Sequence, residues 1–465
     1  MDGKRVKVGP LVSMARKLTL SGLVFGALAA GPAVLRVPPG RAQAAAPVTI
    51  TLMLAQDATE TLTWAKAASQ EFEKANPGIH VSIIAALSGN FADKLAVLRA
   101  TGNTPDVWQG GNRTDVRNGW LLDLTRYIER DKEELRPQEF MSSAWKAYAW
   151  GGKIWGVPFV SSGSFVYYNP DLFDLAGLKQ PPVEWEKTGW TWDDMLASAK
   201  KLSILDEKGG LKQAGIGIEP SFYPSEVYSY LWGGDWFDEE TYRTGIVHQS
   251  TFFTQANLDA YQAVVDLMWK HHFAPKTGEA WTWDWFQKGK VAMYMGNGPW
   301  TVMGKNKVLK IRWGLAPLPL VKDRASIVFT DGLVIGSETK HPEEAWKLVK
   351  WLLSQQELLQ YSSHSDLPPA RSTALVPYIT QLAAHSRYHT PSQIMQALMG
   401  AQEYGHDQLA HVIIGYGDIS SRLSPIWAQM WANQISVSSA MQQADAAIRA
   451  YMLTKASGSG TASGK

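Results

Sequence analysis

Between residues 48 and 108, the hydrophobic and polar positions alternate between two patterns, one typical of strands and one typical of helices. The apolar and β-branched run VTITLML (48–54) and the segment HVSII (80–84) predict strands, and a third short strand is expected at 105–108. Residues 60–75 place apolar side chains three and four positions apart, which predicts an amphipathic helix, and a second helix is expected at 91–101. Strands and helices that alternate across short links predict a parallel sheet with right-handed crossovers.

The middle of the chain has a less regular pattern, with frequent Trp, Gly and Pro between residues 145 and 300. Helices are expected at 192–202 and 257–270. The strand-like pieces are 154–158, 165–168, 215–218 and 291–295. The fold class that this mixture predicts is α/β.

A simpler pattern returns after Trp313. Strands are expected at 314–319 and 332–335, followed by an amphipathic helix at 342–353 with a proline near its start and acids in its first turn. The remainder to about Tyr451 is expected to be mostly helical. Residues 457–465 (SGSGTASGK) are expected to form a flexible polar tail.

The first 44 residues have the pattern of a signal peptide. A basic start precedes the apolar stretch 18–30, whose 13 residues are too few to span a membrane, and Ala42-Gln43-Ala44 offers a small-x-small cleavage site. The chain has no cysteine, so no lipid-modified cysteine can anchor it. We expect export to the periplasm or the extracellular space, without a lipoprotein anchor.

Composition and charge exclude several classes of function. The absence of cysteine excludes disulfides, thiolate zinc sites and a cysteine nucleophile. Residues 45–465 hold 38 basic and 42 acidic side chains, a net charge of −4, so no nucleic-acid surface is expected. His271-His272 and the His406/His411 pair lack metal-ligand spacing, and neither a nucleophile elbow nor a phosphate-binding glycine loop occurs. We expect no cofactor and no metal.

Polar residues follow the predicted strands where ligands usually bind. In parallel α/β sheets, ligands collect beyond the carboxyl ends of the strands, here near 55–57 and 109–113. Gln56, Asp57, Asn112 and Arg113 are therefore candidate ligand-binding residues, with solvated loops as the alternative.

Aromatic residues are unusually frequent, with 21 Trp, 16 Tyr and 14 Phe making up 11% of the chain. Aromatic rings suit the C–H faces of sugars, while carboxylates, amides and guanidinium groups suit their hydroxyl groups. The composition is therefore compatible with carbohydrate binding.

A set of motifs in a fixed order resembles the bacterial extracellular solute-binding proteins of family 1, the substrate receptors of carbohydrate ABC importers, which include the maltose-binding group. These motifs are KLAVLRATGNTPDV (94–107), GWLLDL (119–124), GKIWGVPFVSSGSFVYYN (152–169), FQKGKVAMYMGNGPW (286–300), WGLAPL (313–318) and PEEAWKLVKWLL (342–353). The resemblance spans residues 48 to 452. It implies a two-lobed periplasmic-binding-protein fold, with a ligand cleft between the lobes and a hinge of crossing segments. Lobe 1 would comprise 45–159 and 316–367, and lobe 2 would comprise 160–315 and 368–456.

The resemblance also implies particular ligand contacts. Trp300 matches the position of a ring that stacks on the ligand, and Glu219 and Phe222 match an acid–Pro–aromatic loop. Ser162 stands where the maltose-binding group has a carboxylate, which leaves the sugar specificity open. Trp427 lies where the family often supplies another ring, with core packing as the alternative.

Further candidates come from the residues themselves. Asp331 and Gly332 precede a strand in the returning segment, and Trp232 lies beside a Gly-Gly loop. Trp281, Trp283 and Trp285 alternate as in an extended segment, which would place them on one side, either on a sugar platform or on a core-facing edge. Arg113 and Arg371 could bind an anionic sugar or a phosphate, with structural salt bridges as the alternative.

The resemblance implies reversible binding of a sugar or oligosaccharide by a monomer, with closure of the lobes and docking on the permease subunits of a membrane ABC importer. One alternative is a receptor for a phosphodiester or another polar solute on the same fold. The other is a secreted glycoside hydrolase, with an acid pair such as Glu219 and Glu279 or Asp284. Since sequence spacing does not define such a pair in space, we expect a binding protein rather than an enzyme.

Overall fold

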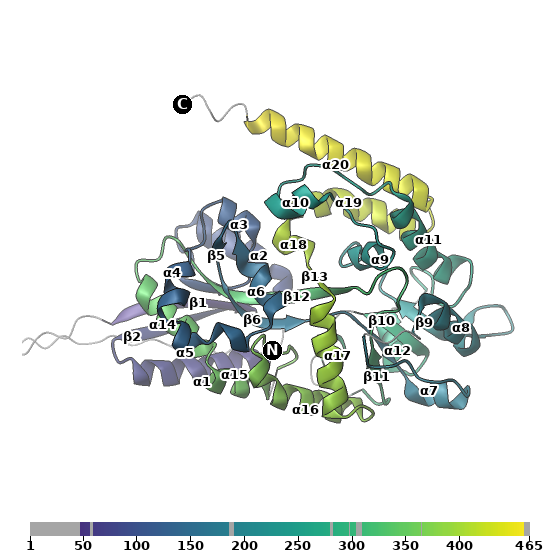
Figure 1. The fold of residues 1–465 in the computed structure, drawn as a ribbon, viewed down its shortest axis with the longest axis horizontal. Helices are drawn as coiled ribbons and strands as arrows, with labels where there is room; N and C mark the ends of the chain where they lie inside the picture. The colour runs from purple at the N-terminus through teal and green to yellow at the C-terminus, as the bar shows by residue number, and fades with distance from the viewer. Residues whose placement is uncertain are drawn as a thin grey trace, which may run out of the picture. The chain divides into compact units, whose positions relative to one another are not determined.

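The computed structural model describes residues 47–55, 59–185, 190–279, 282–296, 298–303, 309–363 and 365–459. The predicted signal peptide therefore lies outside the described residues. Two α/β regions, each built around its own sheet, make up the described part (Figure 1).

The first sheet begins with the predicted strand–helix–strand pattern. Strands β1 (Val48–Ala55), β2 (Ile79–Ala86) and β3 (Val107–Gln109) are parallel, with β1 in the centre. Helices α1 (Thr59–Ala75) and α2 (Ser88–Ala100) form the two connections. The three strands and two helices expected from the sequence are confirmed.

Strand β12 (Ser326–Ile335) completes the first sheet. It runs antiparallel to β3 through Leu333–Ile335 and to β6 (Val157–Ser162), and it pairs in parallel with β13 (Gly405–Asp407). The order is β13-β12-β3-β1-β2, with β6 also paired to β12. The sequence predicted only the last residues of β12 and missed β13, which consists of three residues whose side chains are not fully buried.

The second sheet has the order β11-β7-β10-β9-β8. Its strands are β7 (Phe165–Tyr168), β8 (Ile204–Leu205), β9 (Leu211–Ile218), β10 (Val291–Gly296) and β11 (Gly314–Ala316). β10 is parallel to β9 and antiparallel to β7. The chain passes from the first sheet to the second between β6 and β7, and it returns between β11 and β12. A separate hairpin joins β4 (Ala149–Trp150) and β5 (Lys153–Ile154).

The remaining helices cover the sheets and fill the carboxyl-terminal part of the chain (Figure 1). Before β9 they are α3 (Arg113–Arg117), α4 (Thr125–Arg130), α5 (Lys132–Leu135), η1 (Pro137–Glu139), α6 (Ser142–Tyr148), α7 (Pro170–Leu175) and α8 (Trp192–Leu202). Between β9 and β12 they are α9 (Glu226–Leu231), α10 (Glu239–Thr244), α11 (Gln255–Trp269), α12 (Thr282–Gln287) and α13 (Trp300–Met303). After β12 they are α14 (Pro342–Leu352), α15 (Gln355–Ser362), η2 (Ser372–Ala374), α16 (Leu375–Ser386), α17 (Pro391–Glu403), α18 (Leu409–Val412), α19 (Tyr416–Trp431) and α20 (Val437–Ser459).

Local sequence explains why the helices begin where they do. Thr191 caps α8 in a reciprocal capping box with Asp194, and the helix then buries Trp192, Met195 and Ala199 on one face. Helix α14 has its proline in the first turn beside Glu343 and Glu344, which favour the positive end of the helix dipole. The helix α20 continues to Ser459, so its end overlaps the tail predicted from residue 457, while residues 460–465 lie outside the described part.

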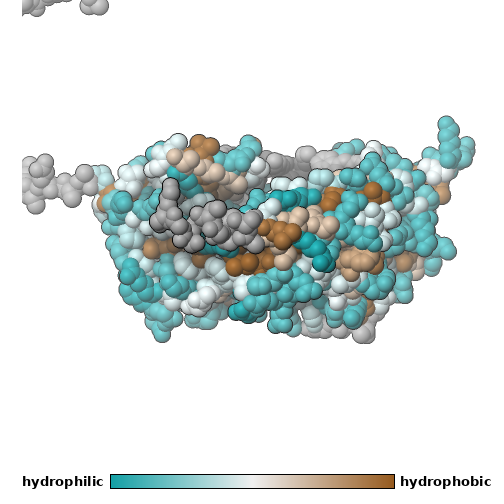
Figure 2. All heavy atoms as spheres, turned by 90° about the horizontal axis from the view of Figure 1, so that it is seen from above, coloured by the Kyte–Doolittle hydropathy of each residue, from teal (hydrophilic) through white to brown (hydrophobic). Residues whose placement is uncertain are grey.

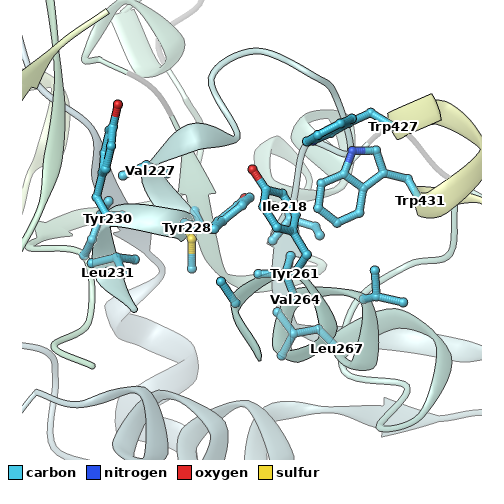
Figure 3. Packing of buried hydrophobic residues seen from close by; sticks show 14 of the residues in the cluster. Ile218, Val227, Tyr228, Tyr230, Leu231, Tyr261, Val264, Leu267, Trp427 and Trp431 are labelled. Atoms are coloured by element: carbon cyan, nitrogen blue, oxygen red, sulfur yellow. The ribbon is translucent and has the colours of Figure 1, made fainter. Parts of the chain in front are cut away.

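Many aromatic side chains belong to the core. Trp427 and Trp431 of α19 point toward Tyr261 of α11 and Tyr228 of α9 (Figure 3). The indole of Trp427 is fully buried, and its Nε1 donates a hydrogen bond to Ser225 Oγ at 2.9 Å. Among the residues that the structure describes, the fully buried tryptophans are Trp108, Trp236, Trp313, Trp346, Trp427 and Trp431. Packing therefore accounts for much of the aromatic excess.

The prediction that Trp283 and Trp285 lie on an extended segment is wrong. Both lie on α12, which packs on β10 through buried Phe286 and hydrogen-bonds β9 through Thr282 Oγ1 and the Ile218 carbonyl at 3.0 Å. Alternation over a few residues was too short to distinguish a strand from one helical turn and a half. Trp281 lies outside the described residues.

The face shown in Figure 2 is largely hydrophilic, with small groups of hydrophobic residues between the polar ones. Within the described ranges, no helix combines the length and the apolar character needed to cross a membrane.

Candidate ligand-binding site

A cavity of ≈ 440 Å³ lies where the carboxyl ends of β1 and β3 approach β12 and segments of the second α/β region. Its lining residues are Ala55, Thr61, Ser88, Gln109, Val160, Tyr223, Trp300, Phe329, Asp331, Tyr361, Ser365, Asp366, Leu367 and Gln408. Ala55 and Gln109 belong to the two strand ends at which the sequence predicted a ligand. We call this cavity the cleft pocket.

Aromatic rings form much of the wall of the cleft pocket. Trp300 begins α13 and meets Phe329 of β12 edge-to-face, with ring centroids 4.9 Å apart. Tyr223 packs against the same phenylalanine at 6.0 Å. Tyr361 of α15 is held by Phe159 at 4.7 Å and Trp64 at 5.1 Å. Because these rings contact one another or the core, they are positioned before any ligand arrives.

Hydrogen bonds orient the polar side chains of the pocket. Gln109 Nε2 donates to Asp331 Oδ2 at 3.1 Å, and Gln109 Oε1 accepts from the Ala55 backbone N–H at 3.3 Å. The Tyr223 hydroxyl donates to Gln408 Oε1 at 2.6 Å. Burial raises the pKa of the Tyr223 phenol well above its usual range, so this hydroxyl stays protonated.

The charged side chains in the described lining of the pocket are all acidic. Its described lining carries two carboxylates, Asp331 and Asp366, and neither a lysine nor an arginine. Carboxylates accept hydrogen bonds from hydroxyl groups, amides both accept and donate them, and the rings offer apolar faces. Such an arrangement suits a neutral polyhydroxylated ligand. Over the ranges that the structure describes, no cluster of three or more His, Cys, Asp or Glu could hold a metal.

Two of the residues predicted from the sequence, Trp300 and Asp331, line the cleft pocket. Gln56 and Asp57, which follow β1, lie outside the described residues, as does Trp281. Glu219 lines a second, smaller cavity of ≈ 30 Å³ beside Ser164 and Tyr228. Its Oε1 accepts from the Tyr294 hydroxyl at 3.0 Å, and burial raises its pKa.

Asn112 and Arg113 have structural partners instead. The Asn112 side chain caps α3 by accepting from the N–H groups of Thr114 and Asp115, the latter also completing a capping box. Arg113 donates to the backbone carbonyls of Tyr242 and Val412, and its guanidinium lies 5.6 Å from the ring centroid of Trp150. Neither residue lines the cleft pocket.

Replacing Asn112 by alanine should therefore lower the free energy of unfolding by about 1 kcal/mol, the usual cost of a lost helix cap. Chemical denaturation would measure it. Serine at the same position can still cap the helix and serves as the control. A large loss of sugar affinity in the alanine variant, without loss of stability, would contradict the capping role.

Other predicted residues lie in the core or pack elsewhere. Phe222 is buried against Trp236 and Trp427, so two rings predicted as ligand contacts, Phe222 and Trp427, belong to one core cluster. Trp232 directly follows α9 as its C-cap and meets Trp192 edge-to-face at 4.8 Å. Trp283 stacks on Phe286 at 5.7 Å.

The last three predicted residues also lie outside the lining. Arg371 is 2% exposed and pairs with Glu139, with its Nε 2.9 Å from Oε2. This pair is the structural salt bridge that the sequence analysis gave as the alternative to ligand binding. Gly332 is pressed against Tyr148, whose ring would lie 2.7 Å from an added Cβ. Ser162 is buried in β6.

Several lining residues had no distinctive signal in the sequence. Tyr223, Tyr361 and Gln408 come from three distant segments, and only folding brings them together. Gln109 could have been named, because it begins the segment 109–113 at which the sequence predicted a ligand.

The comparisons with known proteins agree with this geometry. Residues 56–357 match the family of bacterial extracellular solute-binding proteins. A protein from Brucella abortus named as a binding protein is 23% identical over 335 residues, 69% of this chain and 75% of the relative. The arabinooligosaccharide-binding protein of Halalkalibacterium halodurans is 25% identical over 282 residues, 57% of this chain and 56% of the relative.

Among solved structures, an ABC substrate-binding protein from Listeria monocytogenes in complex with cycloalternan has a TM-score of 0.72 and 23% identity, covering 87% of this chain and 99% of that one. The fold is therefore that of two-lobed solute-binding proteins, with the ligand cleft between the lobes. The chain belongs to the bacterial extracellular solute-binding proteins.

Proposed function

We propose that the protein captures a neutral sugar or oligosaccharide in the cleft pocket and delivers it to an ABC importer. The observation that carries this proposal is the wall of Trp300, Phe329 and Tyr223 beside the polar groups of Asp331, Gln109 and Gln408. Rings and paired hydrogen-bonding groups are what a sugar's faces and hydroxyls require. Two proteins named above, an arabinooligosaccharide-binding protein and a substrate-binding protein in complex with cycloalternan, support the ligand class.

The lobes would comprise 45–159 with 316–367 and 160–315 with 368–456, as predicted from the sequence. We infer that contacts from a ligand to both lobes favour the closed form, which would then dock on the permease as a monomer. Export to the periplasm or the extracellular space would place the protein where such a ligand arrives. Gln56, Asp57 and Trp281 stay predictions as ligand contacts.

The charge of the pocket argues against a phosphodiester receptor. A phosphate needs a basic side chain or a helix start directed at it. The described lining offers only the carboxylates Asp331 and Asp366 as charged groups. The negative charge of a phosphodiester would therefore lie near the two carboxylates, and the described lining has no cationic side chain to compensate it.

Isothermal titration against maltotriose, arabinotriose, cycloalternan and glycerophosphodiesters would test the proposal. Saturable heat is expected for at least one neutral sugar and none for the phosphodiesters. Release of reducing ends is measured in parallel, and none is expected. Turnover without saturable binding would favour the hydrolase, while saturable binding of the phosphodiesters alone would favour that receptor class.

A further inference from the structure

Behind the cleft pocket, Gln408 connects the pocket wall to a buried histidine. Gln408 lies just before α18 and accepts the hydrogen bond of the Tyr223 hydroxyl. Its Nε2 lies 2.8 Å from Nε2 of His411 and 3.3 Å from Nδ1, so the shorter contact is to Nε2. His411 is 7% exposed, and the same amide nitrogen lies 3.4 Å from the Thr330 carbonyl. The other ring nitrogen, Nδ1, lies 3.3 Å from Asp407 Oδ1. These contacts form a chain, Asp407–His411–Gln408–Tyr223, that we call the relay.

The relay has two hydrogen-bonding states. When His411 is neutral with its proton on Nδ1, Nε2 accepts from the Gln408 amide N–H, and the amide oxygen accepts from Tyr223. When His411 is protonated, Nε2 becomes a donor and would face another donor. The amide can remove this conflict by turning over, so that its oxygen accepts from His411 and its NH₂ group faces the Tyr223 oxygen. The Tyr223 proton then no longer has Gln408 as its acceptor.

Acidic groups surround His411 on several elements. Asp407 ends β13, Asp331 lies on β12 and Asp115 on α3, while Arg113 of α3 interacts with Asp407. The ring of Tyr148, at the end of α6, has its centroid 5.9 Å from that of His411. Burial alone would lower the pKa of His411, but the three carboxylates outweigh it and raise the pKa above 6.5. These carboxylates therefore favour the protonated state of His411.

We propose that His411 is a positioning residue that sets, through Gln408, whether the Tyr223 hydroxyl donates its hydrogen bond to Gln408 or into the cleft pocket. The proposal rests on the function proposed above, because it assigns the freed donor to the sugar. A phenol is a better hydrogen-bond donor than acceptor, so protonation of His411 should tighten sugar binding. As the pH rises through the titration of His411, the affinity should fall by roughly 2- to 10-fold, the worth of one hydrogen bond.

The relay is tested first in the sugar-free protein. NMR would follow the imidazole nitrogens of His411 and the Cζ resonance of Tyr223 between pH 5 and 9. The Tyr223 resonance is expected to titrate with the same midpoint as His411. In Gln408→Leu, His411 should still titrate, but Tyr223 should no longer follow it. The relay would be overturned if the Tyr223 resonance of the wild type did not shift with the titration of His411. It would also be overturned if Tyr223 followed His411 equally in Gln408→Leu, because that would show a through-space effect of the His411 charge.

Titration with maltotriose over the same pH range provides the second measurement. The wild type should show the fall in affinity, and His411→Gln, which cannot titrate, should show a flat profile. His80→Gln removes a histidine whose side chain is 58% exposed and should keep the wild-type profile. An unchanged pH profile in folded His411→Gln would overturn the proposal. Lack of binding to every sugar of the panel would overturn the proposed function instead, and the sugar-free titration would still decide the relay.

Discussion

Replacing Trp300 by alanine should weaken sugar binding by roughly 1–3 kcal/mol, on the order of 5- to 150-fold in Kd. The ring lines the cleft pocket and is fixed edge-to-face against Phe329, so it offers its apolar area to a ligand at little entropic cost. Isothermal titration with the tightest-binding sugar of the panel measures the change. Phenylalanine at this position should restore part of the affinity, because it keeps a smaller ring.

The matched control is Trp232→Ala. Trp232 is also partly buried and in edge contact with another ring, Trp192, but it does not line the pocket. Its loss should lower the thermal stability and leave Kd within about twofold of the wild-type value. Equal losses of affinity in the two variants would refute a direct contact from Trp300.

Glu226→Gln should change how stability depends on pH. Glu226 is the first residue of α9 and is 0% exposed. Burial, helped by the nearby charge of Asp235, raises its pKa from 4.5 to about 8. The folded state therefore holds a proton that the unfolded state loses above pH 4.5, so stability falls as the pH rises toward 8. The slope is about 1.4 kcal/mol per pH unit for one such group.

Glutamine is close in shape to the protonated carboxyl and does not titrate. The variant should match the free energy of unfolding of the wild type near pH 4.5. At pH 8 it should exceed the wild-type value by several kcal/mol, on the order of the slope per pH unit multiplied by the pH range between the two measurements. Denaturant unfolding at both pH values measures the difference. Glu129→Gln, at a side chain that is 72% exposed, is the control and should leave the pH dependence unchanged. The same slope in Glu226→Gln as in the wild type would show that another group is responsible.

The β1–β3 part of the first sheet and several helices were predictable because each has a strong local pattern. The apolar run of β1, the amphipathic spacing of α1 and the proline start of α14 specify their structures without help from distant residues. The alternation around Trp283 failed because the packing of Phe286 and Thr282 on the second sheet decided the conformation. Strand β13 had too few residues for any pattern and exists because β12 pairs with it.

The site was less predictable for a physical reason. The ends of β1 and β3 follow from topology, so Gln109 lay within reach of sequence analysis, and Trp300 followed from the family resemblance. Phe222 and Trp427 have the residue types of a sugar site, but burial in a core depends on contacts with Trp236 and Tyr261, which sequence spacing does not reveal. Tyr223 and Gln408 become partners only through a hydrogen bond between segments 185 residues apart.

Strand β12 also governs the order in which this chain can fold during synthesis. Its partners lie on both sides of it in the sequence: the Gln109–Asp331 hydrogen bond joins residues 222 positions apart, and Ser326 pairs with Gly405. A growing chain that has completed β1, β2 and β3 still has an unpaired sheet edge until β12 emerges. Such non-local pairing makes folding slow and leaves partly folded chains open to association through that edge. The nascent first sheet therefore has a long interval in which a chaperone could bind it.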